Sequence, residues 1–137
     1  MAMKMLVDLE RCVGCWSCSM ACKVGNDLPD DDYRVIVRTL GNGAGHDRPI
    51  GVYPKLAMSW QPVFSTKCVF CATRLAEDKP PYCSYNCPTG ALAFGDDSDP
   101  DSDYSRELQR VYDAGYRVYT AQKWEDSRSG ITYACRR

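Results

Sequence analysis

Eight of the nine cysteines fall into two blocks whose spacing suits metal binding. They are Cys12, Cys15, Cys18 and Cys22 in the first block, and Cys68, Cys71, Cys83 and Cys87 in the second. Thiolates are soft ligands that select zinc ions or iron-sulfur clusters. Eight of them suffice for two centres with four ligands each, so the first question is which kind of centre the spacing favours.

The first block has the pattern C-x2-C-x2-C-x3-C, which is the ligand run of bacterial ferredoxins with two clusters. Three cysteines at three-residue intervals offer thiolates to one [4Fe-4S] cubane, and the fourth, one helical turn further on, serves the neighbouring cluster. A chain that does this twice acquires pseudo-two-fold symmetry, because each half lends one ligand to the other. We therefore predict cluster 1 on Cys12, Cys15, Cys18 and Cys87, and cluster 2 on Cys68, Cys71, Cys83 and Cys22.

Other chemistry is less well supported. Two zinc sites would use the same thiolates, but zinc ribbons pair C-x2-C knuckles and have no use for the longer first run, so a zinc-stapled interaction module is the weaker alternative. Cys135 stands apart from both blocks, and we expect a free thiol or a packing residue. His46, the single histidine, lies in the glycine-rich stretch 41–49 and is expected to be a solvated loop residue. No P-loop lysine follows those glycines, so they do not predict a phosphate site.

Composition narrows the class of protein further. A chain of 137 residues with net charge -1 is one domain by length. Two oxidised clusters would bring the charge of the holoprotein to about -5, which disfavours nucleic-acid binding. The N-terminal residues do not form a secretory signal, and no apolar run is long enough to span a membrane. We predict a cytoplasmic location without a membrane span of its own, with export only alongside a signal-bearing partner.

The cysteine blocks must be held by strands and short helices. Hydrophobic alternation predicts strands at residues 4–9, 33–40, 52–60 and 90–95, the last pairing with the first. Pro54 restricts the third strand to an edge or a bulge. Helices are expected at 17–24 and at 102–114, the second ended by Gly115, and an extended segment at 116–120. The acidic run 96–103 has no bidentate glutamate at its end and is predicted to be a solvated linker rather than a calcium loop.

These expectations combine into an α+β fold. Residues 1–95 form the predicted ferredoxin-like domain for two [4Fe-4S] clusters, with a loop at 41–50. Residues 96–137 form an acidic linker, a helix and a C-terminal extended arm, and we expect this segment to dock on a partner protein.

The chain also resembles a known family in several stretches. Arg11-Cys-Val-Gly-Cys-Trp-Ser-Cys-Ser-Met-Ala-Cys-Lys23, followed by Asn26-Asp-Leu-Pro29, is similar to the opening of the iron-sulfur subunits of the dimethyl sulfoxide reductase family of molybdenum and tungsten enzymes. The second cysteine block, as far as Asp96, resembles the closing motif of those subunits. Typical members carry four cysteine motifs, whereas this chain has no cysteine between Cys22 and Cys68.

The resemblance implies an electron-transfer protein that relays single electrons through two [4Fe-4S] clusters and is not an enzyme by itself. It further implies the small subunit of a molybdopterin-dependent oxidoreductase, so no catalytic residue is expected. The implied partners are a large catalytic subunit with molybdenum or tungsten and a further electron donor or acceptor protein. A free-standing soluble ferredoxin is the alternative within this class. Lys23 and Lys67, each next to a predicted ligand, are candidates for raising a cluster potential.

Overall fold

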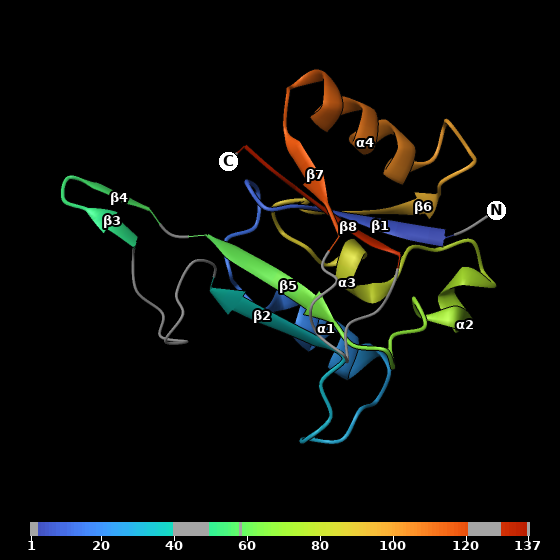
Figure 1. Ribbon diagram of the computed structural model, residues 1–137. Helices are drawn as coiled ribbons and strands as arrows, with labels where there is room; N and C mark the ends of the chain where they lie inside the picture. Colours follow the sequence, from blue (N-terminus) through green and yellow to red (C-terminus); the bar gives the residue numbers. More distant parts are fainter. Residues whose placement is uncertain (1–2, 40–49, 58, 121–129, 137) are drawn as a thin grey trace.

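The computed structural model describes residues 3–39, 50–57, 59–120 and 130–136, and in them it combines helices with sheets (Figure 1). The largest sheet has the strand order β6-β1-β8-β7. Its members are β1 (Met3–Asp8), β6 (Leu92–Asp96), β7 (Arg117–Tyr119) and β8 (Ile131–Cys135). β1 pairs antiparallel with β6, as predicted, and parallel with β8 on its other side.

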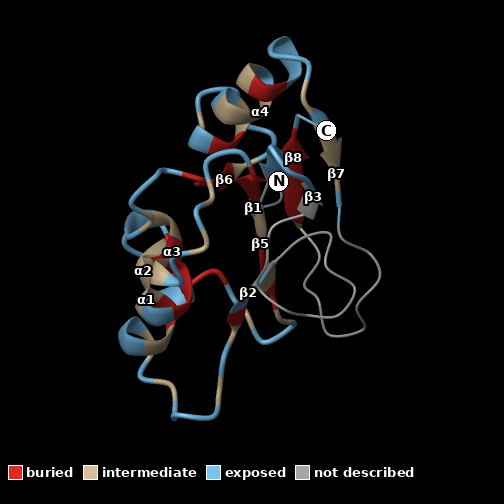
Figure 2. Cartoon of the chain, turned by 90° about the vertical axis from the view of Figure 1, so that its left-hand side faces the viewer, coloured by how far each residue is buried: buried red, intermediate tan, exposed pale blue. Residues whose placement is uncertain are grey.

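The two central strands of this sheet are buried on both faces. Successive side chains of a strand point to opposite faces, so Met5 and Val7 enter one core while Leu6 enters the other. The first core also contains cysteines of both blocks, and the second contains Tyr104 and Val111 of the long helix. Figure 2 shows the buried residues concentrated on these strands. The sheet therefore separates the cysteine-bearing side from the helix that covers its other face.

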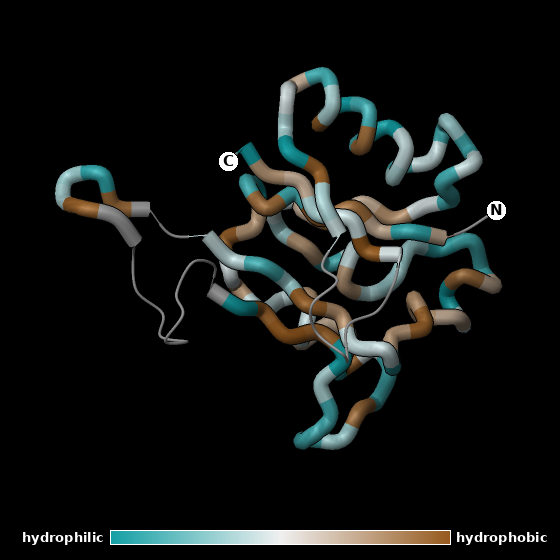
Figure 3. The backbone as a smooth tube through the Cα atoms, in the orientation of Figure 1, coloured by the Kyte–Doolittle hydropathy of each residue, from teal (hydrophilic) through white to brown (hydrophobic). Residues whose placement is uncertain are grey.

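That helix is α4 (Asp103–Asp113), close to the predicted range 102–114. The Ser102 side chain accepts a hydrogen bond from the Ser105 amide, which satisfies one of the free donors at the helix start. Gly115, in the left-handed region at φ 77°, follows the last turn as predicted. Hydrophobic and hydrophilic residues alternate along α4 (Figure 3). Its apolar face lies on the sheet, and its polar face is turned to solvent.

A second, two-stranded sheet pairs β2 (Val35–Thr39) with β5 (Trp60–Phe64), which agrees with the predicted strand at 33–40. The predicted single strand over 52–60 is wrong. In its place β3 (Ile50–Val52) and β4 (Lys55–Ala57) form a hairpin with Tyr53 and Pro54 in the turn, and β5 begins separately. Proline suits a turn position because its φ is fixed and it has no N–H to donate. The loop 41–49 and His46 lie outside the described residues.

The C-terminal segment completes the main sheet. β7 confirms the extended segment expected near 116–120, and β8 lies between β7 and β1. Helix α4 packs on β1 and β6, so the residues after Asp96 share a sheet and a core with those before it. Docking of this segment on a partner stays a prediction. Among the described residues, no helix combines the length and the apolar character needed to cross a bilayer.

Candidate iron-sulfur centres

The first cysteine block lies in a tight loop between β1 and α1 (Ser17–Gly25). The amides of Arg11 and Cys12 both donate to the Asp8 carbonyl, which reverses the direction of the backbone at the strand end. Gly14 and Trp16 have positive φ angles of 67° and 65°. At Gly14 a Cβ atom would meet the Trp60 ring at 2.6 Å, so a glycine allows both the turn and the close approach of the indole.

The second block is divided between two short helices, α2 (Ala72–Leu75) and α3 (Tyr82–Tyr85). Phe70 and Cys71 have positive φ angles of 55° and 53°, and the backbone curls there before α2 starts. Cys83 lies within α3, next to α1. Cys87 follows α3 in a turn, and its sulfur accepts a hydrogen bond of 3.3 Å from the Ala91 amide. Both blocks thus present sulfurs from curled backbone and short helices.

The structure brings these sulfurs into two groups, which we name by their members. The first thiol group is Cys12, Cys15, Cys18 and Cys87, and the second thiol group is Cys22, Cys68, Cys71 and Cys83. The members of the first group line one pocket, in which Val37 and Pro62 of the second sheet also take part. Each group takes three cysteines from one block and one from the other. These are the sets that the spacing predicted, and their assignment as cluster ligands stays a proposal.

Electrostatic interactions between the sulfurs follow the same grouping, with one interaction that crosses between the groups. Burial raises the pKa of Cys12, and Cys87 and Cys15 raise it further. Burial also raises the pKa of Cys18 to about 12, again with contributions from the other three members of its group. In the second thiol group burial raises the pKa of Cys22, and Cys71 and Cys68 add to the shift. The pKa of Cys83 lies well above its usual value, first because it is buried and then because of Cys68, of Cys18 in the first thiol group, and of Cys71 and Cys22.

The two groups differ in their exposure. Cys15 is exposed, and its pKa is lowered because Ser17 Oγ lies 3.4 Å from its sulfur. In the second thiol group Cys22, Cys71 and Cys83 are all buried. Phe70 next to them is also buried and packs on the Phe94 ring at 5.0 Å between centroids. Water therefore reaches one edge of the first group more readily than it reaches the second group.

The donors present fit two anionic sulfur-rich centres. Buried thiols stay protonated unless a cation stabilises the thiolate, so metal binding here would release protons. Two buried side-chain atoms of the described residues have no hydrogen-bond partner, Ser19 Oγ and Arg34 Nε. Ser19 lies between Cys18 and Cys22 on α1, and the charge of Arg34 acts on Cys22. Buried polar atoms normally have partners, so each of these two is available to a bound acceptor.

A mononuclear metal ion has a stricter geometry. A structural zinc ion requires four ligand atoms around one point, with each sulfur about 2.3 Å from the metal. In the part of the chain that the structure describes, no three His, Cys, Asp or Glu side chains converge in this way. In a cubane, by contrast, each thiolate binds a different iron, so the sulfurs stand further apart.

The two lysines next to predicted ligands do not point to the sulfurs. Lys23 Nζ donates to the carbonyl oxygens of Pro29, Asp30 and Asp32 at 2.6, 2.9 and 3.0 Å. Lys67 Nζ lies 3.5 Å from the Asp32 carboxylate. Both lysines therefore bind the turn at residues 29–32, and their effect on a cluster potential stays a prediction.

Two residues near the second thiol group were missed in the sequence. Asn26 Nδ2 lies 3.6 Å from the sulfurs of both Cys22 and Cys71, whereas the sequence indicated only a helix end there. Arg34 was included in a strand without a role. A polar residue shortly after a ligand is the signal that could have pointed to Asn26. Nothing local marks Arg34, because its relation to Cys22 arises from the packing of β2 on α1.

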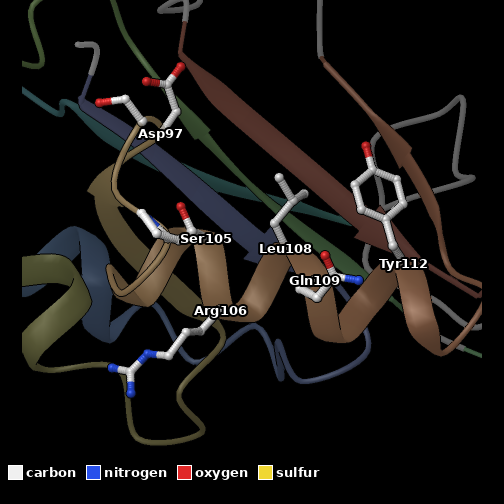
Figure 4. Close-up of a pocket in the computed structure, with 8 residues that line it drawn as sticks. Asp97, Ser105, Arg106, Leu108, Gln109 and Tyr112 are labelled. Carbon is white, nitrogen blue, oxygen red and sulfur yellow. The ribbon is translucent and has the colours of Figure 1, made fainter.

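Two other features lie apart from the thiol groups. Cys135 is buried in β8 with Arg117 Nη2 3.9 Å from its sulfur, in keeping with the packing role expected for it. A shallow pocket on the outer side of α4 contains no cysteine (Figure 4). It is lined by Asp97, Ser98, Pro100, Ser105, Arg106, Leu108, Gln109 and Tyr112.

Comparison with known proteins agrees with this geometry. The family model for the 4Fe-4S dicluster domain matches residues 3–97, which is more than half of the chain. A protein of Halobacterium salinarum, provisionally named as a dimethyl sulfoxide reductase iron-sulfur subunit, is 36% identical over 131 residues, covering 89% of this chain and 45% of its own length. A polysulfide reductase chain of Wolinella succinogenes is 28% identical, covering 76% of this chain and 81% of its own length.

A third relative, the thiosulfate reductase electron transfer subunit of Salmonella typhi, is 30% identical over 66% of this chain and 74% of its own length. The chain thus spans less than half of the halobacterial relative and about four fifths or less of the other two. The matched domain contains all eight cysteines of the two thiol groups. The chain therefore belongs to the 4Fe-4S dicluster domain family, whose cofactors are two [4Fe-4S] clusters.

Proposed function

We propose that this chain is the electron-transfer iron-sulfur subunit of a molybdopterin-dependent oxidoreductase, built on a ferredoxin-like domain with pseudo-two-fold symmetry. The observation that carries the proposal is the interleaving of the blocks, three cysteines of one with one of the other in each thiol group. We assign cluster 1 to the first thiol group and cluster 2 to the second. When bound, the clusters supply one-electron redox chemistry, and the chain itself provides no acid, base or nucleophile.

The residues of the chain position the thiolates and control their access to water. Positive φ angles at Gly14, Trp16 and Cys71 curl the backbone so that successive cysteines face one centre. Phe70 and Phe94 keep water from the second thiol group. The exposed Cys15 gives the first thiol group an edge on the surface. Such an edge allows a redox partner to come close to cluster 1 without rearrangement of the chain.

We infer the partners from the names of the relatives. Reductase components such as the polysulfide reductase chain and the thiosulfate reductase electron transfer subunit support a large catalytic subunit, with molybdenum or tungsten, as one partner. A further electron donor or acceptor protein would exchange electrons at the other end of the relay. The free-standing ferredoxin is the second candidate, because the first block has the ligand spacing of bacterial ferredoxins with two clusters.

Metal analysis of anaerobically purified protein tests the cofactors. Two cubanes contain about eight iron atoms and about eight acid-labile sulfides per chain, and they give a brown protein with EPR signals on reduction. A colourless protein with two zinc atoms would instead support the zinc-stapled module. The Cys135→Ser variant is the matched control, and we expect it to keep the full iron content.

A ligand exchange tests the interleaving. In Cys22→Ser we expect the EPR signal of the cluster on the second block to change, while the signal of the cluster on the first block stays intact. Cys87→Ser should give the reverse result. If each variant altered the cluster of its own block instead, the proposed ligand sets would be wrong.

Isolation of the tagged chain from its native host separates the two candidate functions. Co-purification of a large subunit that contains molybdopterin supports the subunit assignment. Elution of the chain alone, with both clusters intact and able to exchange electrons with soluble donors, would favour the free-standing ferredoxin.

A further inference from the structure

Asp8, the last residue of β1, contacts both chain segments that bring sulfurs to the first thiol group. Its carbonyl accepts hydrogen bonds from the amides of Arg11 and Cys12 at 3.1 and 3.2 Å, where the first cysteine loop begins. Its own amide donates to the Ala91 carbonyl at 2.8 Å. The Ala91 amide in turn donates to the Cys87 sulfur at 3.3 Å. The backbone of Asp8 therefore links the loop that carries three of the sulfurs to the fourth sulfur, which comes from the second block.

The Asp8 side chain is held by cations from two elements. Only 4% of it is exposed, and its Oδ2 lies 2.6 Å from Arg110 Nη2 on α4 and 3.6 Å from Arg11 Nε. Its Oδ1 accepts a hydrogen bond of 3.0 Å from the Glu10 amide. Glu107 bonds Arg110 Nε at 2.7 Å and lies 3.6 Å from Arg11 Nη1. A buried carboxylate is stable only while it is paired, so Arg110 keeps Asp8 in this position.

Strand β8 adds two contacts at the same place. The Leu9 amide donates to the Ala134 carbonyl at 2.9 Å, and the Arg136 amide donates to Glu10 Oε1 at 3.0 Å. The C-terminal segment thus reaches the start of the first cysteine loop from both α4 and β8. It supports this loop from within the same chain, whatever it contacts on a partner.

The second thiol group has supports of its own. Arg74 of α2 donates from Nε to the Pro80 carbonyl at 2.6 Å, and its guanidinium lies 4.5 Å from the centre of the Tyr82 ring. Tyr82 directly precedes Cys83 in α3. These contacts fix the loop that joins α2 to α3, and none of them involves Asp8 or α4.

We propose that Asp8 and Arg110 are positioning residues of cluster 1, and that through this pair the C-terminal segment supports cluster 1 and not cluster 2. The inference rests on the proposed assignment of cluster 1 to the first thiol group. Groups behind the ligands orient them and strengthen metal binding. Without Arg110 the buried carboxylate is drawn toward water, so the turn after β1 opens more often and the loop loses its alignment with Cys87.

Release of iron from the anaerobic holoprotein to bathophenanthroline disulfonate tests the proposal, with EPR of reduced samples to follow each cluster. The signal of cluster 2 is identified with Cys22→Ser. For Arg110→Met we expect cluster 1 to be released about tenfold faster, and its EPR signal to broaden because its sulfurs are held less uniformly. The initial release of cluster 2 should change by less than about threefold. Arg110→Lys keeps a cation beside Asp8 and should recover part of the loss.

Arg74→Met is the matched variant at the second thiol group, and it should accelerate the release of cluster 2 rather than cluster 1. This comparison matters because Cys15 is exposed, so a general loss of stability would release cluster 1 first in both variants. Arg106→Met makes the same substitution at an exposed position of α4 (Figure 4), and it should change either rate by less than about threefold.

Three results for Arg110→Met overturn the proposal: equal acceleration of both clusters, no acceleration of cluster 1, or earlier loss of cluster 1 in Arg74→Met as well. If Arg110→Met retains neither cluster, Asp8→Asn decides, because it removes the charge and keeps an oxygen for the Glu10 amide. We expect it to accelerate the release of cluster 1 alone, by about fivefold. Equal acceleration of both clusters, or none, overturns the proposal there too. Absence of iron from the unaltered protein would instead refute the proposed function.

Discussion

Replacing Arg110 by methionine should leave a buried carboxylate without its best partner. Arg110 on α4 places Nη2 2.6 Å from Asp8 Oδ2 and Nε 2.7 Å from Glu107 Oε2. Asp8, at the end of β1, has only 4% of its side chain exposed. The network also includes Arg11, whose Nε lies 3.6 Å from the same Asp8 oxygen. It joins the covering helix to the residues that begin the first cysteine loop.

The expected loss of stability depends on which interactions of Asp8 remain after Arg110 is replaced. Removing one partner of a buried ion pair costs about 3–5 kcal/mol. The Arg110 side chain is itself 34% exposed, and Arg11 keeps part of the interaction with Asp8. We therefore expect Arg110→Met to lower the free energy of unfolding of α4 by about 2 kcal/mol. Asp8→Asn removes the buried charge and keeps an oxygen to accept from the Glu10 amide, and its Arg110 still bonds Glu107. We expect Asp8→Asn to lower the same free energy by about 1 kcal/mol.

Amide hydrogen exchange of the anaerobic holoprotein measures the loss of stability of α4 without global unfolding. Global unfolding is unsuitable because a protein with bound cofactors does not unfold reversibly in two states. A loss of 2 kcal/mol corresponds to about a 30-fold decrease in the protection of the α4 amides. Asp8→Asn should decrease the protection by about fivefold. Arg106→Met, the same change at an exposed position of the same helix, should have less than about a threefold effect.

The order of the variants decides whether the reasoning is right. Only Arg110→Met keeps the buried Asp8 charge without its closest cation, so this variant must lose more protection of the α4 amides than Asp8→Asn. The double variant should lose less protection than the sum of the two single losses, because the carboxylate that loses its closest cation in Arg110→Met is then absent. Equal losses in the two single variants, or a loss in Arg106→Met as large as in Arg110→Met, would refute the argument.

Three further predictions concern packing and pH. Tyr133 donates a 2.6 Å hydrogen bond to the Pro62 carbonyl, and burial raises its pKa from 10.0 to about 12. A raised pKa in the folded state means that the contribution of Tyr133 to stability is complete below pH 10 and falls by about 2 kcal/mol by pH 12, so anaerobic bleaching of the clusters should accelerate over that range less in Tyr133→Phe than in the unaltered protein. Gly25→Ala places a methyl group inside the Tyr82 ring and should cost about 1–3 kcal/mol, seen as faster iron loss that Tyr82→Ala reverses. Lys23→Met releases three carbonyl oxygens and should make the turn at 29–32 the first site of limited proteolysis.

The parts that could be predicted from the sequence are those with local causes. Cysteine spacing is set by the size of the bound object, so it indicated which sulfurs the structure brings together. Helix α4 has its own start and stop signals in Ser102 and Gly115. The pairing of β6 with β1 follows from two apolar runs of similar length. Each of these features can be recognised within a few residues of the chain.

The missed parts depend on partners far away in the sequence. β8 lies beside β1 although most of the chain separates them, and the apolar run Ile131–Cys135 gives no indication of its neighbour. Pro54 fits either an edge strand or a turn, and the hairpin of β3 and β4 decides between them. The charge of Arg34 acts on Cys22 of α1 because β2, which follows Arg34, packs on that helix. Non-local contacts of this kind leave no local pattern to recognise.

The insertion of β8 between β1 and β7 also imposes an order of events during synthesis. The ribosome completes all eight thiol-group cysteines before it makes residues 131–135, and at about 5–20 residues per second this leaves an interval of seconds. Throughout that interval β1 has an open edge and the sheet lacks its central neighbour. Iron that is delivered to the nascent polypeptide would therefore reach the cysteines while the sheet behind them still lacks β8. The addition of β8 would then complete the sheet after the metal centres have formed.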